Sequence, residues 1–340
     1  MGQIHHSILP IPLENPLSAP MKPFEPINRG FNSTFKQGQL SIGVVVPIEN
    51  YPQSPVPTMK DHLKRVQLIE QLGFKALWLR DIPFNVPNFG DAGQMYDPFT
   101  YLGYLAAKTS NIALGIASIA LPLHHPANVA KAAASVDQLS EGRLIMGVAS
   151  GDRLSEYPAM GLDFEKRGQL FREAFTYIRK AQESFPTIES STYGTLNGRM
   201  DILPKATSHK IPMLMTGYSR QSLEWNAQNA DGWMNYPRNL YQQLHNIKKW
   251  RQLIAESQQY DKPFMQPLYV ALEPNHDYKP TPIHLGFRIG TNYLIDYLRQ
   301  LKSIGVNHLA INLRFNNMNM EQTLEQIAKN VLPHFHLNNQ

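Results

Sequence analysis

The chain has 340 residues, of which 42% are hydrophobic and 17% are charged, enough to bury a large core in one α/β domain. Its formal net charge of +5 comes from 32 basic and 27 acidic residues spread along the sequence. The densest basic cluster, Lys248, Lys249 and Arg251, lies in a helical pattern typical of a solvated face, so we expect no nucleic-acid partner. Cysteine is absent, which excludes disulfides and thiolate chemistry.

Residues 1–38 are predicted to form an extended N-terminal arm that precedes the folded domain of residues 39–340. Six prolines between positions 10 and 26 would break any helix in this arm, and the pattern of a signal peptide is missing. No apolar run approaches the ~20 residues of a membrane span. We therefore expect a cytoplasmic protein without membrane contacts. His5 and His6 lie in the arm, and we expect no metal site there or elsewhere.

From residue 40 onward, short apolar runs alternate with longer helical patterns. The predicted strands are 41–47, 75–80, 112–119, 143–149, 211–216, 231–235, 265–272 and 307–313. The predicted helices are 58–72, 98–109, 127–139, 164–184, 220–229, 239–256, 291–303 and 320–330. Eight strands, each followed by a helix, predict a (β/α)₈ TIM barrel.

The lengths of the connections indicate where the site lies. Helix-to-strand turns are mostly short, whereas the strand-to-helix segments 81–97, 150–163 and 273–290 are long insertions. Function is therefore expected at the carboxyl ends of the strands. An open doubly wound sheet is the second choice, but no G-x-G-x-x-G fingerprint follows the first strand.

Small residues end three of the predicted strands, in SIALPLHHP, GRLIMGVASGDR and TGYSRQSLEW. Gly151 lets a bound group approach the backbone. Ser219 precedes a predicted helix, where backbone N–H groups and the helix dipole suit an anion, and Ser222 would add a hydroxyl. Taken alone, Ser219 also fits an ordinary helix cap.

These segments, together with WLRDIPF and PTPIHLGFRIGTNYL, resemble bacterial-luciferase-like flavin monooxygenases from about residue 31 to the end. The resemblance implies a barrel, FMN as cofactor, a homodimer and oxygen chemistry on a small organic substrate, with reduced flavin supplied by a separate NAD(P)H:flavin reductase. It also implies a non-proline cis peptide beneath the flavin ring at Ala117–Ser118. The flavin-binding residues expected are Ala117, Ser118, Ser150, Gly151, Tyr157, Gly217, Tyr218, Ser219 and Ser222.

Two positions depart from the luciferase pattern. The histidine that acts as base in luciferases is replaced, since Asp81 is followed here by Ile82, so we do not expect light emission from an aldehyde. A phosphate-binding arginine of luciferases falls on Ser150. One of Arg153, Arg220 and Arg288 could take its place, because guanidinium pairs well with phosphate.

Four residues are the catalytic candidates. Arg80 and Asp81 end the second strand and should face the site, although a salt-bridged pair stiffening the loop is the alternative. His124 and His125 lie at the third strand's mouth, where one of them is expected to be a proton donor and the other structural, and His125 is the catalytic candidate. Arg288 lies in the long segment after the seventh strand, which could be a lid for an anionic substrate.

Other classes of protein remain open at this point. A deazaflavin-dependent oxidoreductase is the main alternative, and a non-catalytic flavin-binding protein is another. A metal-dependent hydrolase fits less well, because clustered histidines and carboxylates are few at the strand ends. Alanine-rich helices 98–109 and 127–139 are the expected dimer interface, since small residues allow close helix packing.

Overall fold

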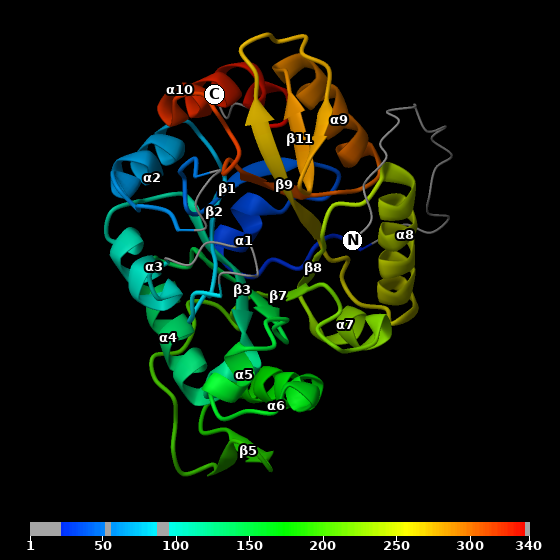
Figure 1. Cartoon of the computed structure of the whole chain (residues 1–340). Coiled ribbons are helices and arrows are strands. Elements are labelled where there is room, and N and C mark those ends of the chain that lie inside the picture. The colour runs from blue at the N-terminus through cyan, green and yellow to red at the C-terminus, as the bar shows by residue number, and fades with distance from the viewer. Residues whose placement is uncertain (1–21, 52–55, 87–94, 337–340) are drawn as a thin grey trace.

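The computed structural model describes residues 22–51, 56–86 and 95–336, and its core is a closed barrel of eight parallel strands (Figure 1). The barrel strands are β1 (Ser41–Val45), β2 (Ala76–Leu79), β3 (Ala113–Ala120), β4 (Leu144–Ala149), β7 (Met213–Thr216), β8 (Gly232–Met234), β9 (Phe264–Leu272) and β12 (His308–Asn312). Each strand pairs with the next, and β12 pairs with β1 to close the ring. The predicted (β/α)₈ barrel and its eight strands are confirmed.

A helix follows each barrel strand and packs on the outside of the barrel. These helices are α2 (His62–Gln71), α3 (Pro98–Ala106), α4 (Pro126–Leu139), α6 (Arg167–Lys180), α7 (Leu223–Asn229), α8 (Leu240–Glu256), α9 (Thr291–Ser303) and α10 (Met320–Asn330). Local sequence explains their starts: Asp97 caps α3 and proline opens α3 and α4. None of the described helices has the length and apolar character that crossing a membrane requires.

Helix α2 begins later than its sequence pattern indicates. The sequence pattern predicts a start at Thr58, but Met59 and Asp61 have left-handed backbones, with φ of 59° and 54°. The buried Glu49 carboxylate accepts hydrogen bonds from the backbone N–H groups of Thr58 and Met59. This tertiary contact holds the segment out of the helix, so the prediction is wrong for residues 58–61.

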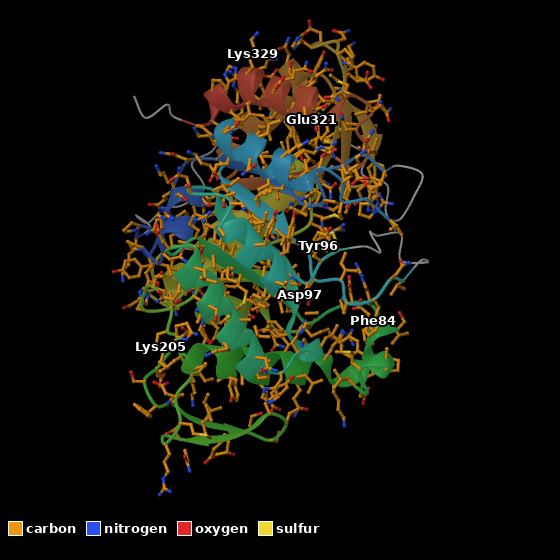
Figure 2. All side chains as sticks on the ribbon, turned by 90° about the vertical axis from the view of Figure 1, so that its left-hand side faces the viewer. Phe84, Tyr96, Asp97, Lys205, Glu321 and Lys329 are labelled. Carbon is orange, nitrogen blue, oxygen red and sulfur yellow. The ribbon has the colours of Figure 1, made fainter. Side chains whose placement is uncertain are left out.

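Two hairpins extend the barrel. Strands β10 (Thr281–Ile283) and β11 (Gly286–Ile289) lie between β9 and α9, where an insertion was predicted. Strands β5 (Thr187–Ser190) and β6 (Gly194–Asn197) lie instead between α6 and β7, in a helix-to-strand connection. Figure 2 shows Phe84, which follows β2, and Lys205, which precedes β7, on opposite sides of the molecule.

Part of the predicted extended arm is helical. Helix α1 (Arg29–Thr34) is capped by Asn28, whose side chain accepts from the N–H of Phe31. Phe31 and Phe35 are 2% and 3% exposed, and they pack in the barrel interior with Trp78. The extended conformation is therefore wrong for residues 29–34, because apolar burial outweighs the proline-rich context. Residues 1–21, including His5 and His6, lie outside the described residues.

His308, the first residue of β12, is fully buried inside the barrel. Trp78 Nε1 donates to His308 Nε2 at 2.8 Å, so the other ring nitrogen of the neutral histidine, Nδ1, carries the proton and donates to Ser41 Oγ at 2.6 Å. Ser41 Oγ in turn donates to the carbonyl of Thr34. This chain connects α1, β1, β2 and β12, and it makes His308 a structural group.

Acid should destabilise the protein through its buried histidines. Burial lowers the pKa of His308 to about 3 and that of His62 to about 4, with smaller effects from His336 and Arg65 respectively. The unfolded chain binds these protons near pH 6.5. Stability should therefore fall as the pH drops from 6.5 toward 4, by roughly 1.4 kcal/mol per pH unit for each histidine once its unfolded form is protonated. Urea unfolding at several pH values measures the slope.

A variant of one of these histidines tests this assignment. His62→Gln should reduce the slope, whereas His245→Gln, which changes an exposed histidine of α8, should leave it unchanged. An unfolding free energy that stays constant between pH 6.5 and 4.5 would contradict the expectation.

Candidate active site

A cavity of about 530 Å³ opens at the carboxyl ends of the barrel strands. Its volume lies within the roughly 300–1,000 Å³ typical of small-molecule sites. Every barrel strand contributes to its wall, directly or through the residues that follow the strand. Its lining residues include Arg80, Asp81, Ala117, Ser118, Ala120, Ala149, Gly151, Asp152, Arg153, Glu156, Gly217, Tyr269, His284, Leu285, Asn312, Arg314 and Phe315.

A second cavity of about 470 Å³ lies at the opposite end, near the residues that precede β7, β8 and β9. Its charged side chains pair with one another: the buried Asp231 accepts from Arg179 and from Lys210, and Lys210 also contacts Glu25 at 2.5 Å. This network joins residues before β1 to the barrel. TIM-barrel sites lie at the carboxyl face, so we place the candidate active site in the first cavity.

Small residues form one side of the first cavity. Ala117, Ser118, Ala149, Gly151 and Gly217 come from the ends of β3, β4 and β7 and leave room for a flat group. The peptide bond between Ala117 and Ser118 is cis, as the resemblance implied. The pairing of β3 with β4 shifts its register there, between residues 116 and 119.

Two residues expected to contact the flavin, Ser150 and Tyr157, lie outside the lining of the cavity. Tyr157 is fully buried, and its hydroxyl donates to the carbonyl of Ser150. A Cβ on Gly151 would lie 2.8 Å from the Tyr157 oxygen. Gly151 lines the cavity, but Tyr157 and Ser150 do not. The expectation that Ser150 and Tyr157 contact the cofactor is not supported, because packing directs both residues away from the cavity.

The turn after β7 differs in detail from its prediction. Helix α7 begins at Leu223, with Ser222 as its exposed cap, and Ser219 Oγ donates to the carbonyl of Thr216 at 2.8 Å. Both serine hydroxyls are therefore engaged within the chain, and neither serine lines the cavity. Tyr218 is 49% exposed and packs its ring against Trp233.

The backbone of this turn is nevertheless suited to an anion. Gly217, Ser219 and Arg220 have φ values of 55°, 47° and 60°. Within the described part of the chain, the backbone N–H groups of Tyr218, Ser219 and Arg220 have no hydrogen-bond acceptor. Successive unpaired N–H groups of this kind form anion-binding concavities. The donors are main-chain groups rather than the predicted hydroxyls.

Asp81 and His124 form a hydrogen-bonded pair beside the cavity. His124 Nε2 lies 2.7 Å from Asp81 Oδ2, which also accepts from the N–H of Ala120 at 3.1 Å. The Asp81 side chain is 3% exposed and that of His124 28% exposed. Burial opposes protonation of His124, but the hydrogen bond and charge of Asp81 outweigh it and raise the pKa of His124. The pair can hold a proton between solvent and the cavity.

His125, the histidine chosen from the sequence, does not face this cavity. It is exposed at the N-terminus of α4, where its Nδ1 accepts from the N–H of Ala127 at 3.3 Å. Its ring packs edge-on against Tyr177 and Tyr193. Pro126 at the first helical position makes residue 125 the helix cap, and this signal could have separated the two histidines.

The two arginines predicted to be catalytic, Arg80 and Arg288, also differ in whether they line the cavity. Arg80 lines the cavity, as expected. Arg288 lies on β11 and pairs with Glu273 at 2.5 Å, outside the cavity lining. The lid role predicted for Arg288 is not supported, because this ion pair holds its side chain elsewhere.

Sequence reasoning missed an acidic residue beside Asp81. Glu156, in the short helix α5 (Glu156–Ala159), lines the cavity and lies 3.5 Å from Arg153. Burial raises the pKa of Glu156 despite the opposing charge of Arg153, and the charge of Asp81 raises it further. No motif marks this position. Among the described residues, no group of three or more His, Cys, Asp or Glu could hold a metal ion.

Comparison with known sequences identifies relatives. The family model of the luciferase-like monooxygenases matches residues 40–277. An uncharacterised protein of Mycobacterium tuberculosis is 31% identical over 193 residues, covering 51% of this chain and 67% of that protein. The alkanal monooxygenase alpha chain of Photorhabdus luminescens is 26% identical over 179 residues, covering 52% of this chain and 48% of that protein.

Solved structures share the fold at low sequence identity. A monooxygenase from Streptomyces bottropensis superposes with a TM-score of 0.74 at 17% identity, covering 87% of this chain and all of that one. An F420-dependent secondary alcohol dehydrogenase superposes with a TM-score of 0.72 at 17% identity, covering 88% and 99% of the two chains. The family match extends over more than half of the sequence. The chain therefore belongs to the luciferase-like monooxygenase family.

Proposed function

We propose that the protein is an FMN-dependent oxidoreductase, of the monooxygenase type that uses reduced flavin and oxygen on a small organic substrate. The observation that carries the proposal is the cavity itself, whose small-residue side is continuous with Gly217 of the turn after β7. A flat ring fits against Ala117, Ser118 and Ala149, and a phosphate fits the unpaired N–H groups of residues 218–220.

The residues present fit a phosphorylated flavin in their chemistry. Gly217 has open space where a Cβ would stand, so the turn can approach a ligand closely. Arg220 belongs to the turn and can add a guanidinium to the phosphate site, whereas Arg153 lines the cavity but pairs with Glu156. Arg288, the third candidate arginine, is held by Glu273.

In this proposal the flavin supplies the redox chemistry, and the protein supplies position, proton and shielding from water. Asp81 orients His124, whose Nε2 carries the proton toward the carboxylate. Glu156 provides a second proton-holding group on the same side of the cavity, because burial favours its neutral form. Arg80 adds a fixed positive charge at the end of β2.

Deazaflavin is the second candidate cofactor, since an F420-dependent dehydrogenase shares the fold. An FMN complex of 3,6-diketocamphane monooxygenase from Pseudomonas putida also superposes, with a TM-score of 0.68, 13% identity, and 88% and 99% of the two chains covered. We favour FMN because the luciferase resemblance implies it and an alkanal monooxygenase is a relative in sequence, whereas the F420-dependent dehydrogenase resembles this chain in fold alone.

The partners follow from the proposed reaction. A separate NAD(P)H:flavin reductase would supply reduced FMN, and the working form would be a homodimer. Of the six alanines on the helices expected to form its interface, Ala106, Ala130, Ala133 and Ala134 are buried within one chain, whereas Ala132 is half-buried and Ala107 exposed. A dimer through this face would use its exposed side chains, such as Ala107 and Tyr104, the latter 46% exposed.

Oxygen reactivity tests the proposed function. Protein loaded with reduced FMN without oxygen should be reoxidised on mixing with aerated buffer, at a rate that rises with oxygen concentration. Stopped-flow absorbance of the flavin follows the reaction. Bound reduced flavin that oxygen leaves unchanged, while NAD(P)⁺ or a ketone reoxidises it, would favour a dehydrogenase instead.

A further inference from the structure

One wall of the cavity is built from three aromatic rings of three separate segments. Tyr269 lies on β9, His284 lies between β10 and β11, and Phe315 follows β12. The Tyr269 ring is 5.5 Å from the His284 ring and 5.3 Å from the Phe315 ring, centroid to centroid. All three line the cavity, and together they are called the aromatic wall.

The β10–β11 hairpin packs closely on β9, and this packing fixes the position of His284 in the aromatic wall. Gly286 pairs with Tyr269, and a Cβ on Gly286 would lie 1.8 Å from the Tyr269 carbonyl oxygen. The N–H of Tyr269 donates to the carbonyl of Leu285 at 3.2 Å. Only glycine allows this approach, so the hairpin fixes His284 over the cavity.

A cation stands at the edge of the aromatic wall. Arg314 lines the cavity and is 8% exposed, and its guanidinium carbon lies 5.5 Å from the Phe315 ring centroid and 4.7 Å from that of Tyr51. Its backbone is held as well, since its N–H donates to Asn312 Oδ1 at 3.0 Å. Guanidinium stays charged at any physiological pH and pairs well with carboxylates.

Resting on the proposed flavin function, we propose that the substrate is an aromatic compound carrying an acidic group. Its ring packs on Tyr269, His284 and Phe315, because aromatic rings favour offset or edge-on packing with one another. Its acidic group faces Arg314 beside Phe315, because on the part of the cavity that follows β2 and β4 the carboxylates of Asp81 and Glu156 offset the cations Arg80 and Arg153. The rings and the cation thus select substrate class and orientation.

Three probes of matched shape test the ring and the charge separately. They are 4-hydroxybenzoate, its neutral amide 4-hydroxybenzamide, and the saturated analogue trans-4-hydroxycyclohexanecarboxylate, titrated by calorimetry into protein with and without FMN. The benzoate should bind roughly tenfold more tightly than either of the others. Arg314→Gln should abolish the preference for acid over amide, and Phe315→Leu should reduce the preference for the aromatic ring. Arg299→Gln and Phe185→Leu, both at exposed side chains, are the matched controls.

The outcomes separate this inference from the proposed function. Equal binding of the three probes, no binding in either form of the protein, or an unchanged acid preference in Arg314→Gln would overturn the substrate class. Failure of FMN to bind, with the benzoate preference intact in the flavin-free protein, would overturn the flavin function and leave the aromatic wall supported.

Discussion

Replacing Ala149 with phenylalanine should strongly weaken flavin binding while the barrel stays folded. Ala149 ends β4 and lines the small-residue side of the cavity, so a benzyl group there would occupy the space proposed for the flavin ring. Forcing a ligand past an added ring typically costs a few kcal/mol. We expect FMN affinity to fall by roughly a hundredfold, equivalent to about 2.7 kcal/mol, measured by quenching of flavin fluorescence.

The matched control is Ala255→Phe, which adds the same group at an exposed position of α8. It should bind FMN like the unmodified protein. Thermal unfolding of both variants separates loss of the site from loss of the fold. Unchanged FMN affinity in Ala149→Phe, with a normal melting temperature, would place the flavin elsewhere.

Replacing Asp81 with asparagine should lower the pKa of His124 below its ordinary value of about 6.5. In the unmodified protein, burial alone would lower this pKa, and the hydrogen bond and charge of Asp81 raise it instead. Without the carboxylate only the burial effect and weaker charges remain. The protonated form of His124 would then be lost at lower pH. Heteronuclear NMR of the histidine ring measures the titration directly.

Glu156→Gln should lower the same pKa less than Asp81→Asn does, because the charge of Glu156 contributes less than the hydrogen bond and charge of Asp81. Asp296→Asn, at an exposed position of α9, should leave it unchanged. If the pair delivers a proton, His124→Gln should also remove the pH dependence of flavin reoxidation by oxygen. An identical His124 titration in Asp81→Asn would show that the two side chains do not interact.

Much of the fold could be predicted from the sequence, because parallel strands that are buried on both faces appear in it as short apolar runs. Segments such as ALWL in β2 and LIMGVA in β4 carry that signal, and the helices between them carry the helical period. Exceptions arise where a distant contact overrides the local pattern. Glu49 holds residues 58 and 59 out of α2, and the apolar pair Phe31 and Phe35 draws α1 into the barrel.

The site was less predictable because side-chain direction depends on tertiary partners. Neighbouring histidines look alike in the sequence, yet one pairs with Asp81 and the other caps α4. Arg288 turns toward Glu273, a partner 15 residues away in the sequence, and Tyr157 turns inward to Ser150. Main-chain donors, such as those of residues 218–220, leave no trace in side-chain chemistry. The cis peptide bond at Ala117–Ser118 could be predicted only from the family resemblance.

The central claim is that the carboxyl mouth of the barrel holds FMN, and a competition experiment tests it most directly. The protein is equilibrated with equimolar FMN, riboflavin and coenzyme F420, separated from free ligand, and the bound cofactor is identified by absorbance and mass. We expect about one FMN per chain and little riboflavin, because hydrogen bonds to a charged group contribute roughly 1.5–3 kcal/mol each. Recovery of F420, of riboflavin in equal amount, or of no cofactor would contradict the account.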